Sequence, residues 1–152
     1  KAITTFSGVA HRLEFVREVN GVRYYNDSKA TTPESSIAAV TAFQAQIILI
    51  AGGYDKGSSF REFAETCAQH TRAVILIGKT AGKIKELLLE KKGSGETPSI
   101  FMLKTFEEAF KQANALAKAG DVILLSPACA SYDMFLNYEE RGRQFKDMAK
   151  AL

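Results

Sequence analysis

Short apolar runs alternate with longer amphipathic segments from Gln46 to the end of the chain. The runs Gln46–Gly52 and Ala73–Gly78 are apolar at nearly every position, which is typical of central parallel strands covered on both faces. The remaining segments of the alternation are the strands Ile100–Leu103 and Val122–Ser126 and the helices Ser59–His70, Thr80–Lys91, Thr105–Ala119 and one from about Tyr138. This order predicts a doubly wound α/β sheet.

The start of the chain follows a different pattern. Leu13–Val19 and Val22–Asn26 read as two strands joined by Asn20-Gly21, a strong signal for a two-residue hairpin. Thr32 then suits the N-cap of a helix and Pro33 its first position. We therefore predict a Rossmann-like, doubly wound, mostly parallel six-stranded sheet with an N-terminal antiparallel hairpin and helices on both faces.

Composition limits what the chain can do. Its 152 residues, 46% of them hydrophobic, are enough for one domain, 1–152, and too few for two. The 20 basic and 17 acidic residues give a net charge of +3 without a long block of either sign, so we expect no nucleic-acid partner. No apolar run approaches the roughly 20 residues of a membrane span, and no signal-peptide pattern opens the chain. We expect a cytoplasmic monomer without a membrane partner.

Neither cysteine belongs to a disulfide framework or to a metal-ligand spacing, so we expect no metal site. Cys67 lies in an amphipathic helical pattern and is interpreted as a core residue. Cys129 follows an apolar strand and could be taken for a nucleophile. However, both His11 and His70 are far from it in sequence and no base is its neighbour, which favours a structural cysteine.

Right-handed crossovers place the carboxyl ends of the parallel strands, and the loops that follow them, along one edge of the sheet. Four loops are expected there: NDSKATTP, GGYDKGSS, GKTAG and SPACASYDMF. The segment KKGSGETP, residues 91–98, is expected at the opposite edge as a solvated loop.

The loop NDSKATTP, residues 26–33, places a carboxylate, an ammonium and hydroxyls at the start of a helix, where free N–H groups favour an anionic ligand. An ordinary capped turn remains open as the alternative. In GGYDKG, residues 52–57, paired glycines can let backbone approach a ligand beside Lys56, or can form a simple turn. Ser131, placed at a helix start, can donate to a carboxylate from its hydroxyl and its amide.

Gly78-Lys79-Thr80 resembles the end of a phosphate-binding Walker loop, but the match fails. Such a loop needs a glycine five residues before Gly78, where this chain has Ala73. We interpret Thr80 as an N-cap and Lys79 as a charge at the rim. The chain therefore has no recognisable nucleotide-binding loop of its own.

Several motifs in the same order resemble the C-terminal domain of the Mur ligases, in particular of the members that add D-glutamate. They are His11-Arg12, VNGVRYYNDSKAT, GGYDKG, SPACASYDMF and NYEERGRQF, and they cover nearly the whole chain. The resemblance implies an ATP-dependent ligase that joins D-glutamate to UDP-N-acetylmuramoyl-L-alanine through an acyl phosphate, in cytoplasmic peptidoglycan synthesis. It also implies that ATP and Mg²⁺ are bound mainly by a central domain outside this chain.

The resemblance further implies a role for each matching residue. It implies that Thr31, Lys56 and Ser131 hold the carboxylates of D-glutamate and that Tyr132 and Tyr138 line the pocket. It also implies that Arg12 contacts the ATP phosphates, Asp27 the ribose, and Lys29 the phosphoryl and carboxylate charges. Lys29 and Lys56 are then the catalytic candidates. Because the chain begins with Lys1 rather than Met, we expect a fragment that lacks the N-terminal UDP-binding and central ATP-binding domains and is inactive alone.

Two other functions remain open from the residues. A stand-alone anion- or nucleotide-binding module of Rossmann-like shape would bind its ligand with this chain alone. A non-catalytic interaction domain would use the same loops as a docking surface.

Overall fold

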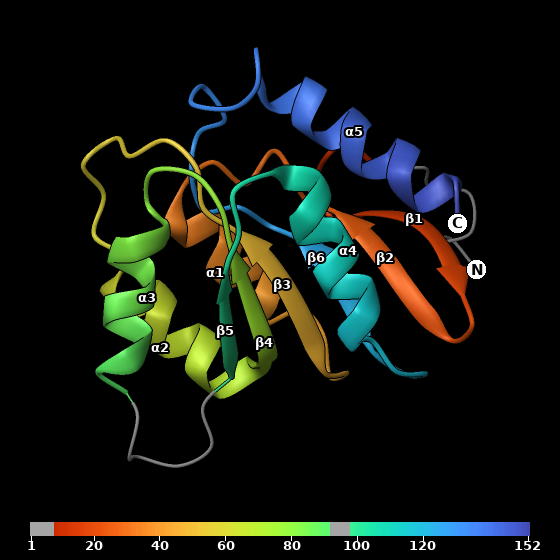
Figure 1. Ribbon diagram of the computed structural model, residues 1–152, viewed down its shortest axis with the longest axis horizontal. Coiled ribbons are helices and arrows are strands. Elements are labelled where there is room, and N and C mark those ends of the chain that lie inside the picture. Colours follow the sequence, from red (N-terminus) through yellow and green to blue (C-terminus); the bar gives the residue numbers. More distant parts are fainter. Residues whose placement is uncertain (1–7, 92–97) are drawn as a thin grey trace.

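The computed structural model describes residues 8–91 and 98–152 (Figure 1). Its strands are β1 Glu14–Val19, β2 Val22–Asn26, β3 Ile47–Ala51, β4 Thr71–Leu76, β5 Ser99–Met102 and β6 Val122–Leu125, and its helices are α1 Pro33–Val40, α2 Arg61–His70, α3 Ala81–Leu89, α4 Phe106–Leu116 and α5 Tyr138–Lys150. The loop expected at 91–98 falls, except for its two end residues, outside the described residues.

The strands form one sheet in the order β1-β2-β6-β3-β4-β5. β1 and β2 are antiparallel, and every other neighbouring pair is parallel. Asn20 and Gly21 both have positive φ, 54° and 81°, as a type I′ turn requires. The predicted six-stranded, mostly parallel sheet with an N-terminal hairpin is therefore confirmed.

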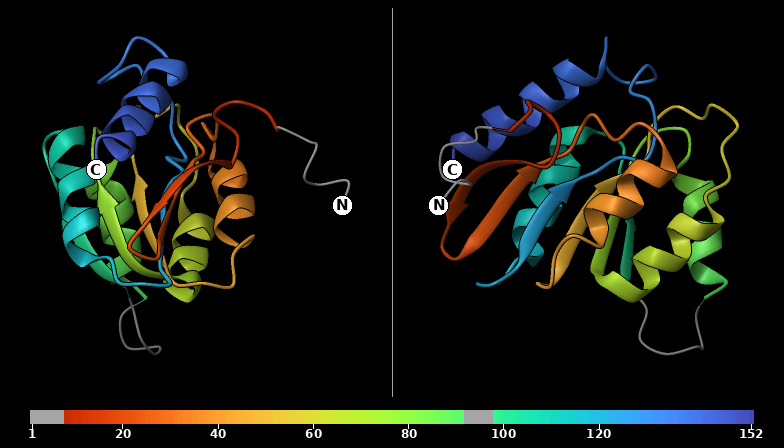
Figure 2. Two further views of the ribbon diagram at one scale, coloured as in Figure 1. Left: turned by 90° about the vertical axis from the view of Figure 1, so that its right-hand side faces the viewer. Right: turned by 180° about the vertical axis from the view of Figure 1, so that it is seen from behind.

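Helices cover both faces of the sheet, as Figure 2 shows. Side chains of α1, α2 and α3 pack on one face, around Leu49 and Leu124. Side chains of α4 and α5 pack on the other, around Ile48 and Ile123. Since β3, β4 and β6 are buried on both sides, nearly every position in them has to be apolar.

Several elements begin or end a few residues from their predicted bounds. β4 starts at Thr71 because the chain is extended directly after α2. The predicted strand end at Gly78 is not reached, and Gly78 itself has a φ of 77°, which is not a strand conformation. α4 ends at Leu116 because Ala117 is extended, with φ −70° and ψ 142°. Among the described residues no helix is long and apolar enough to cross a membrane.

The position of β6 fixes where a ligand can bind. β6 lies between β2 and β3, and the chain continues from β3 into α2 on one face but from β6 into α5 on the other. A crevice opens at such a reversal, beyond the carboxyl ends of the strands. The loops after β2, β3 and β6 therefore meet at this point.

Candidate functional site

Backbone hydrogen bonds tie these three loops into one unit. The loop after β6 lies between the other two and bonds to each of them. Three bonds make the connection: Ala128 N–H to Ala30 O at 3.0 Å, Gly52 N–H to Pro127 O at 2.9 Å, and Tyr54 N–H to Ala130 O at 2.8 Å. The prediction that these loops gather at one edge is confirmed.

Gly52 and Gly53 are needed for this close packing. A Cβ atom at Gly52 would lie 2.1 Å from Ile77 O, and one at Gly53 would lie 2.4 Å from Ala130 O. Both residues also have positive φ, 107° and 152°. The close approach that these glycines permit is to the protein's own backbone, which agrees with the second of the two alternatives that the sequence left open, a glycine-rich turn.

The start of α1 has the predicted cap. Thr32 is extended, its Oγ1 accepts from Ser35 N–H at 3.3 Å, and Pro33 occupies the first helical position. Thr31, half-buried just before the cap, donates its N–H to Lys29 O at 2.9 Å. Thr31 thus immediately precedes the residue that caps the positive end of the helix.

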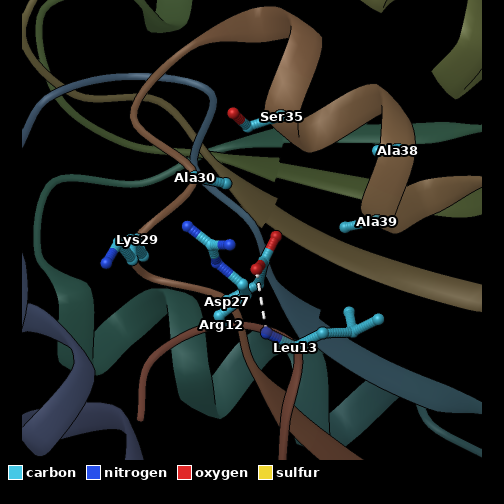
Figure 3. Close-up of a pocket in the computed structure, with 8 residues that line it drawn as sticks. All are labelled: Arg12, Leu13, Asp27, Lys29, Ala30, Ser35, Ala38 and Ala39. Carbon is cyan, nitrogen blue, oxygen red and sulfur yellow. Dashed lines mark hydrogen bonds between the residues drawn. The ribbon is translucent and has the colours of Figure 1, made fainter. Parts of the chain in front are cut away.

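Arg12, Asp27 and Lys29 line one cavity of about 340 Å³ together with the first turns of α1 (Figure 3). The Arg12 and Asp27 side chains lie next to each other in this view, and Lys29 extends to the other side of Arg12. The structure thus brings together the three residues expected at the nucleotide.

Asp27 is almost fully buried, at 5% exposure. Its Oδ1 accepts from Leu13 N–H at 2.9 Å, and its Oδ2 accepts from Ser126 Oγ at 2.7 Å. Burial raises the pKa of the Asp27 carboxyl, against the lowering effect of these two bonds and of the Arg12 charge. Through its bond from Leu13 N–H, the Asp27 carboxylate therefore fixes the backbone next to Arg12.

Lys29 faces the start of α5. Its Nζ lies 5.9 Å from the centre of the Tyr138 ring, and its N–H donates to His11 O at 2.9 Å. The Tyr138 ring also meets the His11 ring edge-on, with centroids 6.0 Å apart. Tyr138 therefore lies with the Lys29 side of the site.

Ser131, Lys56 and Tyr132 lie on the loops after β6 and β3. Ser131 is 2% exposed, Lys56 is exposed, and Tyr132 is 68% exposed with its ring centre 6.5 Å from that of Tyr54. Ser131 O accepts from the N–H groups of Met134 and Phe135. Ser131 thus begins a turn and not a helix, because α5 starts only at Tyr138, which corrects the expected placement.

Thr80 stands at the N-cap position of α3, but its side chain does not cap the helix. Its Oγ1 instead accepts from Gly53 N–H at 3.0 Å and lies 3.3 Å from Cys129 Sγ. Burial raises the pKa of the Cys129 thiol to about 11, so the thiol is protonated at neutral pH. Both thiols are buried, and the geometry agrees with structural cysteines.

Arg141 was missed by the assignment of site residues. It is 1% exposed and donates to Ser28 Oγ at 2.9 Å, Ser28 O at 2.7 Å and Cys129 O at 3.1 Å. The signal for its burial was its spacing of four and eight residues from Phe145 and Ala149, which lie on the buried face of α5.

No group of three or more His, Cys, Asp or Glu side chains that could hold a metal ion occurs within 8–91 and 98–152.

Comparison with known proteins identifies the family. The sequence-family model of the Mur ligase, glutamate ligase domain, matches residues 11–129 of this chain. The chain belongs to the Mur ligase family. The resemblance found in the sequence motifs is thereby confirmed.

This Mur ligase domain has relatives that are named as D-glutamate ligases. It is 54% identical to a UDP-N-acetylmuramoylalanine–D-glutamate ligase of Caldanaerobacter subterraneus subsp. tengcongensis, over 95% of this chain and 32% of the relative. It is 51% identical to the ligase of that name from Caldicellulosiruptor saccharolyticus, over 100% of this chain and 33% of the relative. The domain thus spans about a third of the length of these curated relatives.

Solved structures share the fold of this Mur ligase domain at low sequence identity. A bifunctional folylpolyglutamate synthase/dihydrofolate synthase from Yersinia pestis is 15% identical with a TM-score of 0.65, over 97% of this chain and 32% of that one. The MurF ligase of Thermotoga maritima in complex with ADP is 19% identical with a TM-score of 0.56, over 97% and 33%.

Proposed function

We propose that this domain holds D-glutamate while an ATP-dependent ligase joins it to UDP-N-acetylmuramoyl-L-alanine in cytoplasmic peptidoglycan synthesis. The observation that carries this proposal is the 54% identity to a D-glutamate ligase over 95% of the chain. The meeting of three loops at one sheet edge supports it, because a dicarboxylate needs cations, hydroxyls and free N–H groups fixed close together.

In this proposal the domain orients the attacking amine. Thr31, Lys56 and Ser131 hold the two carboxylates of D-glutamate, and Tyr132 and Tyr138 line the space between the loops. Holding an amine near an acyl phosphate in the correct orientation can supply up to about 7–11 kcal/mol of rate enhancement. Lys56 is exposed, so its ammonium group is accessible to a carboxylate.

The nucleotide belongs to the cavity beside α1. Arg12 contacts the phosphates, Asp27 the ribose, and Lys29 the phosphoryl and carboxylate charges. Asp27 can accept a ribose hydroxyl without losing its bonds from Leu13 and Ser126, because each carboxylate oxygen accepts more than one hydrogen bond.

The rest of the ligase lies outside this chain. Its relatives are about three times as long, and we propose that an N-terminal domain binds the UDP-sugar and a central domain binds most of the ATP and its Mg²⁺. This monomeric domain would then complete both sites by closing onto them, and it would have no turnover alone.

Amide chemical shifts during a titration with D-glutamate test the proposed binding site. Shifts should move at Thr31, Lys56 and Ser131, and L-glutamate, which has the same charge, serves as the control. Movement confined to other parts of the domain would refute the assignment.

Phosphate release tests the proposed reaction. The domain is joined to the upstream domains of a relative and assayed with ATP, D-glutamate and UDP-N-acetylmuramoyl-L-alanine. Lys56→Ala and Ser131→Ala should each raise the KM for D-glutamate more than the KM for ATP. Unchanged activity in both variants would show that these residues do not bind the amino acid.

A further inference from the structure

Arg141 carries a buried positive charge, and Asp133 exerts a Coulombic attraction on it. Within the described residues, no Asp or Glu forms an ion pair with it. It also lies in the first turn of α5, at the positive end of the helix dipole. Burial lowers the pKa of Arg141 to about 10, so it remains charged at neutral pH. Stability alone would favour an apolar residue here, like Phe145 one turn later.

The guanidinium uses its planar shape to join two loops. Its Nε and Nη2 donate to the hydroxyl and carbonyl oxygens of Ser28, and its Nη1 donates to the carbonyl of Cys129. Ser28 Oγ donates in turn to Tyr138 O at 2.7 Å. A single side chain thus fixes the loop after β2, the loop after β6 and the start of α5.

These contacts lie one or two residues from the proposed ligand-binding groups. Ser28 stands between Asp27 and Lys29, and Cys129 is two residues before Ser131. Ala128, next to Cys129, has a φ of 63°, which a non-glycine residue adopts only when its surroundings hold it. The bond from Arg141 to Cys129 O contributes to holding this part of the loop.

We propose that Arg141 is a positioning residue of the ligase, which sets the distance between the nucleotide side of the site at Lys29 and the amino-acid side at Ser131. This inference rests on the proposed function, because it assigns those two sides. The fixed positive charge of Arg141 also attracts anionic groups to the space between the loops. Arg141 does not itself touch the substrate, since it is only 1% exposed.

Arg141→Lys is the decisive variant. Lysine keeps the charge but cannot reach three oxygens in one plane. We expect the variant to fold, with unchanged circular dichroism, and to bind D-glutamate on the order of tenfold more weakly in the amide-shift titration. Amides at Lys29 and at Ser131 should shift together in the ligand-free variant. Arg143→Lys, an exposed arginine on the same helix, is the matched control and should bind as the wild type does.

Ser28→Ala provides a second test that preserves the arginine. It removes one acceptor of Arg141 and should weaken D-glutamate binding by a smaller factor, on the order of threefold. This variant decides the matter if Arg141→Lys does not fold.

The outcomes separate the two proposals. A lower melting temperature of the folded variants with wild-type affinity for D-glutamate would show that Arg141 only stabilises the domain, and would overturn the inference while leaving the proposed function intact. Absence of any D-glutamate-dependent shift in the wild type, both alone and joined to the upstream domains of a relative, would overturn both. Weaker binding in Arg141→Lys and Ser28→Ala with no change in Arg143→Lys supports the inference.

Discussion

His11 is held in its neutral form by the hydrogen bonds of Asn26. Asn26 Oδ1 accepts from Ser28 N–H, so its Nδ2 is the donor that faces His11 Nδ1 at 2.9 Å. Nδ1 must therefore accept, and the proton of the neutral ring lies on Nε2. Burial and the charges of Lys146 and Arg143 lower the pKa of His11, while Glu14 and Glu139 oppose them.

Stability should consequently depend on the protonation of His11. The His11 ring binds its second proton less readily in the folded protein than in the unfolded chain. The contribution of neutral His11 to the free energy of unfolding is therefore complete above pH about 6.5, and it is lost as the pH falls through the lowered pKa of the folded state. The free energy of unfolding in urea, measured from about pH 7.5 to 5, should show the fall.

His11→Asn tests this explanation, since asparagine tolerates the φ of 65° at this position. In this variant the free energy of unfolding should not show the fall that His11 causes between about pH 7.5 and 5. His70→Gln retains His11 and should retain the fall, and a His11→Asn curve parallel to the wild type would contradict the assignment.

Thr80 tests the link between the loops after β3 and β4. Thr80→Val keeps the shape but leaves the Gly53 N–H buried without its acceptor, which should cost about 1–3 kcal/mol of unfolding free energy. Thr80→Ser keeps the hydroxyl and should cost clearly less. Little loss in Thr80→Val together with a clear loss in Thr80→Ser would show that the methyl group matters and the hydrogen bond does not.

For single residues, the sequence predicted which side chains belong to the site better than it predicted their hydrogen-bond partners. Arg12, Asp27 and Lys29 were expected on one site and line one cavity. Thr80 was read as a cap because capping is a local pattern. Its actual partner, Gly53, is 27 residues away, and contacts of that separation depend on packing that a local pattern does not describe.

Among the elements, α5 depends on a glycine that a helix would ordinarily disfavour. Gly142 lies inside this helix, and a Cβ there would be 2.1 Å from His11 Nδ1. The ring of His11 thus packs directly on the helix backbone. Gly82 in α3 has no atom within 4 Å of its would-be Cβ, which makes it a natural comparison.

The two glycines should respond in opposite directions to alanine. Gly82→Ala should stabilise the domain by about 0.5–1 kcal/mol through helix propensity. Gly142→Ala should destabilise it by about 1–3 kcal/mol through overpacking. Thermal unfolding of both variants checks this, and the loss caused by Gly142→Ala should be smaller in a His11→Ala background than in the wild type. Two stabilising substitutions would mean that His11 moves aside freely.

The sequence predicted every element of the sheet but not all of their ends. Hydrophobic periodicity reflects which face is buried, and it can continue past the last residue of a strand. Thus Ile77 remains buried although β4 ends at Leu76. Arg141 was overlooked for the reverse reason, since a charged residue on an apolar face is ordinarily assigned to the surface.

In the whole molecule, protection from hydrogen exchange should follow the strand order. β3 and β6 are completely buried in the middle of the sheet, whereas β1 and β5 form its edges with partly exposed side chains. Amides of β3 and β6 should therefore exchange only through global unfolding, and hydrogen-bonded amides of β1 and β5 through smaller openings. Native-state exchange followed by NMR across a range of urea concentrations measures both. Equal protection in the edge and central strands would contradict this order.

The insertion of β6 between β2 and β3 also constrains how the protein is made. β6 is the last strand of this sheet to leave the ribosome, yet its two neighbours come from the first third of this domain. Until Val122–Leu125 emerge, β2 and β3 have no shared partner and their apolar edges stay open to other chains. The sheet is therefore completed late in synthesis, and a slow passage through residues 52–121 prolongs the period in which the nascent chain can aggregate.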